Sequence, residues 1–274
     1  MTALAAVFPG QGSHAHGMES ELRDEPLLQR GLELLGFDPF PRLDEGTRFQ
    51  QPALFLVSVA EWARSGIEQP VGAAGHSLGE YAALVAAGAL DFDDAVELVR
   101  VRADAMADAS DANPGAMLAV LGGDADAVRA LAGDHGLVIA NDNAPGQLVL
   151  AGAADAVDAA EAAASDLGAR GRRLDVSGAF HSELMAPAAA PLADALRDVE
   201  IHEPRFPVIS NGTARPFEDV REELVANLTR SVRWRETVLA LADAGAEDFV
   251  ELGPGRVLGG LVRRILRDRE AVER

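Results

Sequence analysis

The sequence predicts an α/β protein in which a small ferredoxin-like unit interrupts a larger domain. Two observations lead to this prediction. Short apolar runs alternate with longer helical patterns across residues 1–112 and again across residues 179–274, which indicates one large domain of strands and helices. Between these parts, residues 113–178 follow the order strand, helix, strand, strand, helix, strand, which is typical of a ferredoxin-like unit.

The composition fits a globular enzyme and narrows its chemistry. The chain has 274 residues, of which 48% are hydrophobic and 25% are charged, so it can bury a large core. It contains no cysteine, which excludes disulfides and thiolate chemistry, and we expect neither a metal nor a bound cofactor. A net charge of −20 argues against nucleic acid as a partner, because phosphate binding needs a basic surface.

The N-terminus carries no targeting signal that we recognise. Residues 1–8 lack a positively charged region and end at Pro9, unlike a signal peptide. No apolar run approaches the ~20 residues that a membrane-spanning helix needs. We therefore expect a cytoplasmic protein without a membrane partner. We also expect a monomer.

The first elements are a short strand over residues 3–8 and the glycine-rich turn Phe8-Pro9-Gly10-Gln11-Gly12-Ser13. A buried first strand that ends in such a loop is a common place for a ligand. Helices are then predicted over Glu19–Leu35 and over Pro52–Arg64, with Pro52 in the first turn of the second helix.

The next stretch, Gly75-His76-Ser77-Leu78-Gly79, organises the rest of the chain. Small residues before it suit a buried strand over 71–74, and the apolar run after it suits a helix that ends near Gly88. A serine at a strand-to-helix turn exposes its hydroxyl, and the flanking glycines permit the sharp bend. The pattern predicts Ser77 as a nucleophile.

A helix predicted over Asp93–Ala107 contains a charge where the core is expected. Its apolar stripe includes Leu98, Val99 and Met106, and Arg102 falls on the same face. A buried guanidinium needs a partner, so Arg102 should meet a carboxylate. That carboxylate could belong to the protein, in a structural salt bridge, or to a substrate held by the planar fork of the arginine.

The inserted unit places one histidine at the junction of the two domains. We expect its strands over 116–121, 137–140, 147–151 and 172–176, and its helices over 124–132 and 153–167. His181 follows directly in Ala179-Phe180-His181-Ser182, before a helix predicted over 184–199. Because this segment re-enters the large domain, His181 is the first candidate for the base that serves Ser77.

The last part of the chain returns to the strand-and-helix pattern. Strands are expected over 206–210 and 248–252, and helices over 218–228 and 237–244. Gly253-Pro254-Gly255 then opens an arginine-rich helix.

These motifs in this order resemble the malonyl-CoA:acyl carrier protein transacylase family over nearly the whole chain. The matching pieces are Phe8-Pro9-Gly10-Gln11-Gly12-Ser13, Gly75-His76-Ser77-Leu78-Gly79-Glu80-Tyr81, the helix with Leu98, Val99, Arg102 and Met106, Asn143-Ala144-Pro145-Gly146-Gln147, Ala179-Phe180-His181-Ser182, and Glu251-Leu252-Gly253-Pro254-Gly255.

The resemblance implies a fold and a set of roles. It implies an α/β-hydrolase-like catalytic domain over residues 1–112 and 179–274, with the ferredoxin-like small domain over 113–178. Ser77 would be the nucleophile and His181 the general base. The backbone amides of Gln11 and Leu78 would form the oxyanion hole, and Arg102 would bind the malonyl carboxylate.

Three further residues are expected at the substrate. Phe180 looks like the malonyl-selecting version of its motif, where bulk excludes an α-methyl group. Met106 shares the face of Arg102. Asn227 stands near the position where the family often has a glutamine whose main-chain carbonyl orients the histidine.

The implied activity is transfer of a malonyl group from malonyl-CoA to acyl carrier protein in fatty acid biosynthesis. The phosphopantetheine thiol would be carried by the partner. Two alternatives stay open. An acyltransferase component of a polyketide or malonate decarboxylase system would share every motif. A serine thioesterase or esterase would instead need an acid for its triad, for which Asp142 and Asp175 are candidates.

Overall fold

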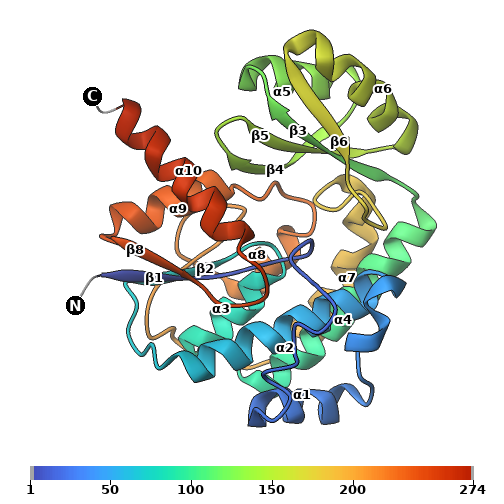
Figure 1. The fold of residues 1–274 in the computed structure, drawn as a ribbon. Coiled ribbons are helices and arrows are strands. Elements are labelled where there is room, and N and C mark those ends of the chain that lie inside the picture. Colours follow the sequence, from blue (N-terminus) through green and yellow to red (C-terminus); the bar gives the residue numbers. More distant parts are fainter. Residues whose placement is uncertain (1–2, 273–274) are drawn as a thin grey trace.

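A computed structural model describes residues 3–272, which form two separate sheets (Figure 1). The first sheet is parallel, in the order β7-β2-β1-β8. Its strands are Leu4–Phe8 (β1), Gly72–Gly75 (β2), Val208–Ile209 (β7) and Asp248–Glu251 (β8). The second sheet is antiparallel, in the order β4-β5-β3-β6. Its strands are Ala116–Gly122 (β3), Val138–Ala144 (β4), Gln147–Gly152 (β5) and Ala169–Arg173 (β6).

Helices cover both sheets and connect them. The α-helices are Pro26–Leu35 (α1), Thr47–Ser65 (α2), Gly79–Ala87 (α3), Phe92–Ala112 (α4), Ala125–Asp134 (α5), Ala154–Ala164 (α6), Ala189–Leu196 (α7), Val220–Ala226 (α8), Trp234–Asp243 (α9) and Val257–Val272 (α10). Short 3₁₀ helices cover Phe40–Glu45, Ser165–Leu167 and Glu183–Ala188. No helix within the described residues is both long enough and apolar enough to cross a membrane.

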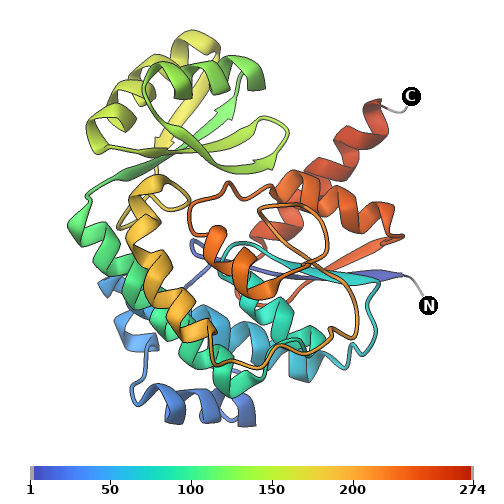
Figure 2. The same ribbon diagram turned by 180° about the vertical axis from the view of Figure 1, so that it is seen from behind.

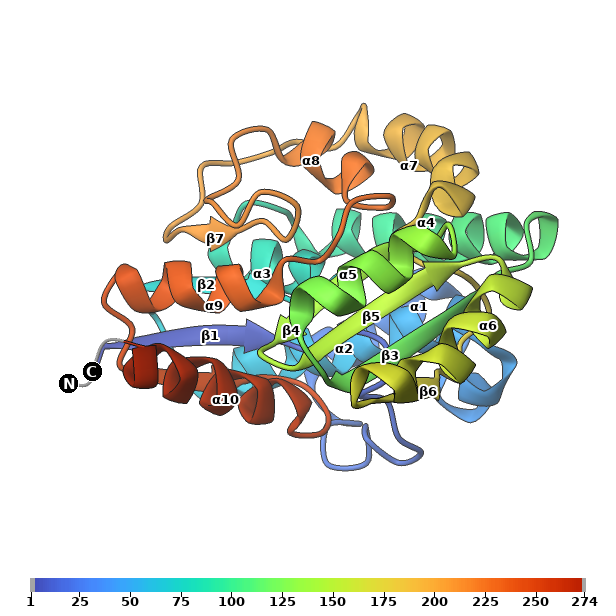
Figure 3. The same ribbon diagram turned by 90° about the horizontal axis from the view of Figure 1, so that it is seen from above.

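Strand β1 lies at the centre of the parallel sheet and contributes to two cores. Ala6 and Phe8 pack on one face, in the core that includes α2 and α3. Ala5 and Val7 pack on the other face, against α9 and α10. In the view of Figure 3, β1 is seen between these two helices. All four side chains are fully buried. This alternation follows from the period of two along a strand.

The antiparallel sheet packs by the same rule. Leu118 and Val120 face α5 and α6, which cover the outer face of the sheet in Figures 1 and 2. Met117 and Ala119 face the opposite way and join the main core. At its edge, β4 also bonds to the segment before α9, because Asp142 N–H donates to the Val232 carbonyl at 2.9 Å. The antiparallel sheet therefore contacts the main core through its inner face and the segment before α9 through its edge strand β4.

The structure corrects several predicted boundaries at prolines. The helix expected from Glu19 starts only at Pro26, because the residue before a proline is disfavoured in helical geometry and Glu25 is extended (ψ 129°). The helix expected from Pro52 starts earlier, at Thr47, and continues through the proline. The helix expected over 184–199 is a 3₁₀ segment that contains Pro187, followed by α7.

We predict that the turn between β2 and α3 does not tolerate a methyl group at Gly75. A Cβ at this position would lie 1.8 Å from the Gly79 carbonyl carbon, so the turn would have to open. We expect Gly75→Ala to lower the free energy of unfolding by ~3 kcal/mol or more, measured by urea denaturation. Gly133→Ala is the matched control, because a Cβ on this exposed face of α5 meets no atom within 4 Å. Equal unfolding midpoints for the two variants would show that the turn has room for the methyl group.

Candidate active site

Ser77 occupies the corner between β2 and α3 with a left-handed backbone, φ 53°. Gly75 and Gly79 permit this corner, because a Cβ on Gly79 would lie 2.2 Å from the Phe8 carbonyl oxygen. The parallel register pairs Phe8 with Gly75, and His76 N–H donates to the Phe8 carbonyl at 2.9 Å. The corner is therefore packed directly against the end of β1.

The His181 ring reaches Ser77 from the segment that follows the antiparallel sheet. Its Nε2 lies 2.8 Å from Ser77 Oγ. Its Nδ1 lies 2.9 Å from the Asn227 carbonyl and 3.0 Å from the Arg230 carbonyl. Because both of these partners accept hydrogen bonds, Nδ1 carries the proton and Nε2 is left as the acceptor for the serine hydroxyl.

Burial keeps this imidazole neutral. His181 is 5% exposed, and its burial, with the Arg102 charge as the second cause, lowers its pKa to about 3. A neutral imidazole at physiological pH can accept a proton, as a general base must. Its orienting partners are main-chain carbonyls. Neither candidate acid of an esterase triad is among these partners: Asp142 pairs with Arg129 at 2.7 Å, and Asp175 is exposed.

Arg102 lies in the core and points at the nucleophile, with 4% of its surface exposed. Its Nη2 donates to Ser77 Oγ at 2.9 Å, and its Nη1 donates to Gln51 Oε1. A protein carboxylate was one of the two partners considered for Arg102, but across residues 3–272 no acid forms an ion pair with this guanidinium. Burial lowers the pKa of Arg102 from its usual value, but an arginine remains charged. The site thus holds one buried positive charge beside the hydroxyl.

The loop after β1 brings Gln11 to the same corner. A Cβ on Gly10 would lie 2.3 Å from the His76 carbonyl oxygen, so this loop lies against the nucleophile turn. The Gln11 side chain is held away from the hydroxyl, since Nε2 donates to Gln50 at 2.9 Å and Oε1 accepts from Thr47 at 2.9 Å. Leu78 is buried and precedes the first residue of α3, so its amide lies at a helix N-terminus.

The three remaining predicted residues are all buried. Met106 Sδ accepts a bond from Gln51 Nε2 at 3.4 Å, and Gln51 Oε1 in turn accepts from Arg102. Phe180 is 5% exposed and joins the main core. The Asn227 side chain donates to the Glu80 carboxyl group. The Asn227 carbonyl is the part that contacts His181.

Sequence reasoning missed the residues that hold these groups in place. Gln51 orients Arg102, and Asn211 Oδ1 accepts the Ser77 N–H at 2.6 Å. Asn143 Oδ1 lies 2.8 Å from His76 Nε2 and so connects β4 to the nucleophile turn. The asparagine-rich segment 141–143 was a visible signal for this last contact, whereas Gln51 and Asn211 carried none.

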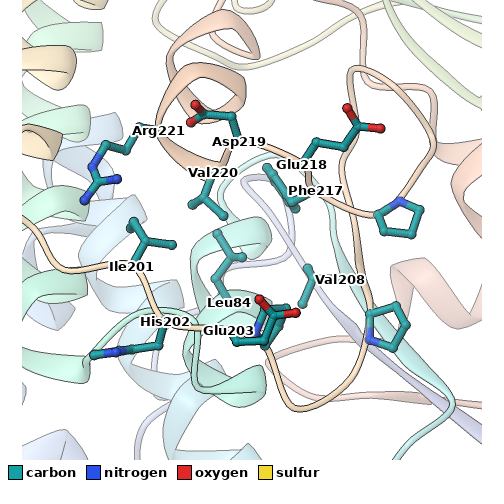
Figure 4. A pocket seen from close by; sticks show the side chains of 13 residues that line it. Leu84, Ile201, His202, Glu203, Val208, Phe217, Glu218, Asp219, Val220 and Arg221 are labelled. Atoms are coloured by element: carbon teal, nitrogen blue, oxygen red, sulfur yellow. The ribbon is translucent and has the colours of Figure 1, made fainter.

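A cavity of about 360 Å³ lies apart from this cluster (Figure 4). It is lined by Leu84 of α3, by the loop around His202 and by the start of α8. None of the predicted site residues lines it. The cavity is therefore not the place where Ser77 would react.

The cluster can transfer an acyl group, because a nucleophile, a base and a fixed positive charge meet at one oxygen. Comparison with known proteins agrees. Residues 6–274 match the family model of the acyl transferase domain. A malonyl CoA-acyl carrier protein transacylase from Bacillus subtilis is 42% identical, over 97% of this chain and 92% of that protein.

Solved structures of malonyl-transacylases are also similar to this chain over nearly its whole length. The malonyl CoA-acyl carrier protein transacylase of Coxiella burnetii superposes with a TM-score of 0.91 at 38% identity, over 97% of this chain and 92% of that one. A malonyl-transacylase solved in complex with its type II polyketide acyl-carrier protein gives a TM-score of 0.90 at 37% identity, over 97% and 94% of the two chains. The chain belongs to the acyl transferase family, among the malonyl CoA-acyl carrier protein transacylases.

Proposed function

We propose that the protein moves a malonyl group from malonyl-CoA to the phosphopantetheine thiol of acyl carrier protein, in fatty acid biosynthesis. The observation that carries this proposal is the buried guanidinium of Arg102, which has no carboxylate of the described chain to pair with and donates to Ser77 Oγ. A buried arginine in that position suits an acyl group that ends in a carboxylate.

The first half-reaction loads the serine. Ser77 Oγ attacks the thioester carbonyl while its proton passes to His181 Nε2, 2.8 Å away. Negative charge develops on the carbonyl oxygen, where the amides of Gln11 and Leu78 would donate. The carbon–sulfur bond then breaks, CoA leaves with the proton from His181, and the malonyl ester remains on Ser77.

The second half-reaction is the reverse with a different thiol. The phosphopantetheine thiol of the carrier protein gives its proton to His181 as the sulfur attacks the malonyl ester. The same amides stabilise the oxyanion, and the proton returns to Ser77 Oγ as the ester bond breaks. These steps use only protein side chains and amides, so the proposal requires no metal and no resident cofactor.

Arg102 and its neighbours would select the acyl group. Arg102 would leave Ser77 Oγ to bind the malonyl carboxylate and would retain Gln51 as an orienting partner. An acetyl group would leave the buried charge unpaired and would be rejected for that reason. Met106 supports Gln51, and Phe180 would exclude substrates with an α-methyl group.

We also propose the domain division and setting that follow from the resemblance. The parallel sheet with its helices would be an α/β-hydrolase-like domain over residues 1–112 and 179–274, and the antiparallel sheet a ferredoxin-like domain over 113–178. We propose a cytoplasmic monomer. A role in polyketide synthesis has the support of the similar malonyl-transacylase that was solved with its polyketide carrier protein. A thioesterase is less favoured, because His181 has carbonyl partners in place of an acid.

The activity is tested by transfer from malonyl-CoA to holo acyl carrier protein, followed by intact mass. We expect the wild type to malonylate the carrier protein and Ser77→Ala to be inactive. Continuous release of free CoA and malonate without a carrier protein would instead indicate a thioesterase.

The selectivity of Arg102 is a second prediction. Arg102→Gln should lower kcat/KM for malonyl-CoA roughly 100-fold, because it removes a charge-assisted contact of ~3 kcal/mol, and should affect acetyl-CoA little. Arg100→Gln is the matched control on the same helix, since Arg100 is partly exposed and pairs with Glu97 and Asp104. Equal losses for malonyl-CoA and acetyl-CoA in Arg102→Gln would refute the selective role.

The low pKa of His181 gives a third prediction. Phenylmethylsulfonyl fluoride is an uncharged reagent that labels a serine only when a base activates it. Because a lowered pKa keeps His181 neutral until the pH falls toward about 3, the labelling rate should be constant from about pH 7.5 down to about pH 5. An ordinary histidine would lose half of this rate near pH 6.5. A midpoint near that value would show that burial does not shield His181 from protonation.

A further inference from the structure

A buried carboxyl group next to the active site has no part in the two half-reactions. Glu80 lies on the first turn of α3 and is 2% exposed. Its Oε1 accepts the backbone N–H of Asn211 at 2.8 Å. The Asn227 side-chain amide donates to Oε1 at 3.0 Å and lies 3.2 Å from Oε2. One carboxyl group therefore holds two segments that are distant in sequence.

The first of these segments holds the nucleophile. Asn211 Oδ1 accepts the Ser77 N–H at 2.6 Å, and Asn211 Nδ2 donates to the Gly75 carbonyl at 2.7 Å. The side chain of Asn211 thus bridges the turn on both sides of the serine. Its own backbone is fixed by Glu80.

The second segment holds the base. The Asn227 carbonyl accepts from His181 Nδ1 at 2.9 Å and so sets the direction in which Nε2 faces. The Asn227 side chain, which is 4% exposed, is held by Glu80 and by Ser210 Oγ at 3.2 Å. A shift of this side chain would move the carbonyl and the imidazole together.

The backbones of both reacting residues need such support. Ser77 has φ 53° and His181 has φ 58°, and a left-handed conformation is unfavourable for residues other than glycine. It persists only where surrounding contacts fix it. The two residues are 104 positions apart, so no local segment sets their separation.

We propose that Glu80 is a positioning residue that fixes Ser77 and His181 relative to each other, through Asn211 on one side and Asn227 on the other. This inference rests on the proposed roles of Ser77 and His181. It adds a hydrogen-bonded connection between them through Glu80, which is buried and would not contact the substrate.

The charge state of Glu80 fits a role as a hydrogen-bonding group. Burial raises the pKa of Glu80 to about 8, although the bonds from Asn211 and Asn227 and the Arg102 charge act in the opposite direction. The nearby Glu223 adds to the increase. At neutral pH the carboxyl group is therefore mainly protonated, and it does not neutralise Arg102. Glutamine is then its closest substitute.

Three variants at this position test the proposal. Glu80→Ala removes the acceptor, and Glu80→Asp withdraws it by one methylene. Both should slow labelling of Ser77 by phenylmethylsulfonyl fluoride, and kcat for malonyl transfer, by roughly 10- to 100-fold. KM for malonyl-CoA should stay within about twofold, because Arg102 keeps its own partners. Glu80→Gln keeps Oε1 in place and should retain rates close to those of the wild type.

Glu223→Gln is the matched control. Glu223 is also a buried glutamate, but it accepts the backbone N–H groups of Glu218 and Asp219 at the start of α8. We expect a lower melting temperature with unchanged rates. If Glu80→Ala does not fold, Glu80→Asp and Glu80→Gln decide the test.

The proposal is overturned if folded Glu80→Asp labels within threefold of the wild type, or if Glu80→Gln is as slow as Glu80→Asp. Labelling by the sulfonyl fluoride does not depend on malonyl-CoA. A protein that labels as predicted but transfers no malonyl group would therefore refute the proposed function and leave the role of Glu80 standing.

Discussion

The structure depends on one constraint, the close parallel packing of β1 against β2 at the turn that carries Ser77. Phe8 lies opposite Gly75 in the register, and its carbonyl accepts the His76 N–H at 2.9 Å. This contact leaves no room for a side chain at Gly79, and it sets the loop with Gln11 beside the nucleophile. The left-handed serine, the start of α3 and the proposed oxyanion donors all follow from it.

The fold was predictable where hydrophobic periodicity was strong. Strand β1 was predicted to within one residue, and the helix predicted over Asp93–Ala107 lies within α4, which continues to Ala112. Strand β6 was predicted three residues late, over 172–176, whereas it covers Ala169–Arg173. It is an edge strand with exposed arginines, so no apolar pattern marks it. Leu174 and Val176, which suggested a strand, pack against the main core instead.

The site residues were predictable where the neighbouring sequence carried a local signal. Ser77 was marked by its glycines, and Arg102 was marked by a charge in an apolar stripe. Of the two carboxylate partners considered for Arg102, the one from the protein is not found among the described residues, and Gln51, which is 51 positions away, supplies a neutral partner. Contacts of this kind, like those of Glu80 with Asn211 and Asn227, join distant segments and leave no local pattern.

The proposed mechanism requires that the buried charge of Arg102 bind a carboxylate on the acyl group. A crystal structure of the protein trapped with malonyl-CoA as the malonyl-Ser77 ester tests this requirement. We expect the malonyl carboxylate to lie within hydrogen-bond distance of both terminal nitrogens of Arg102, with His181 still against the Asn227 carbonyl. A malonyl carboxylate that points into solvent, with Arg102 still bonded to Ser77 Oγ, would contradict the mechanism.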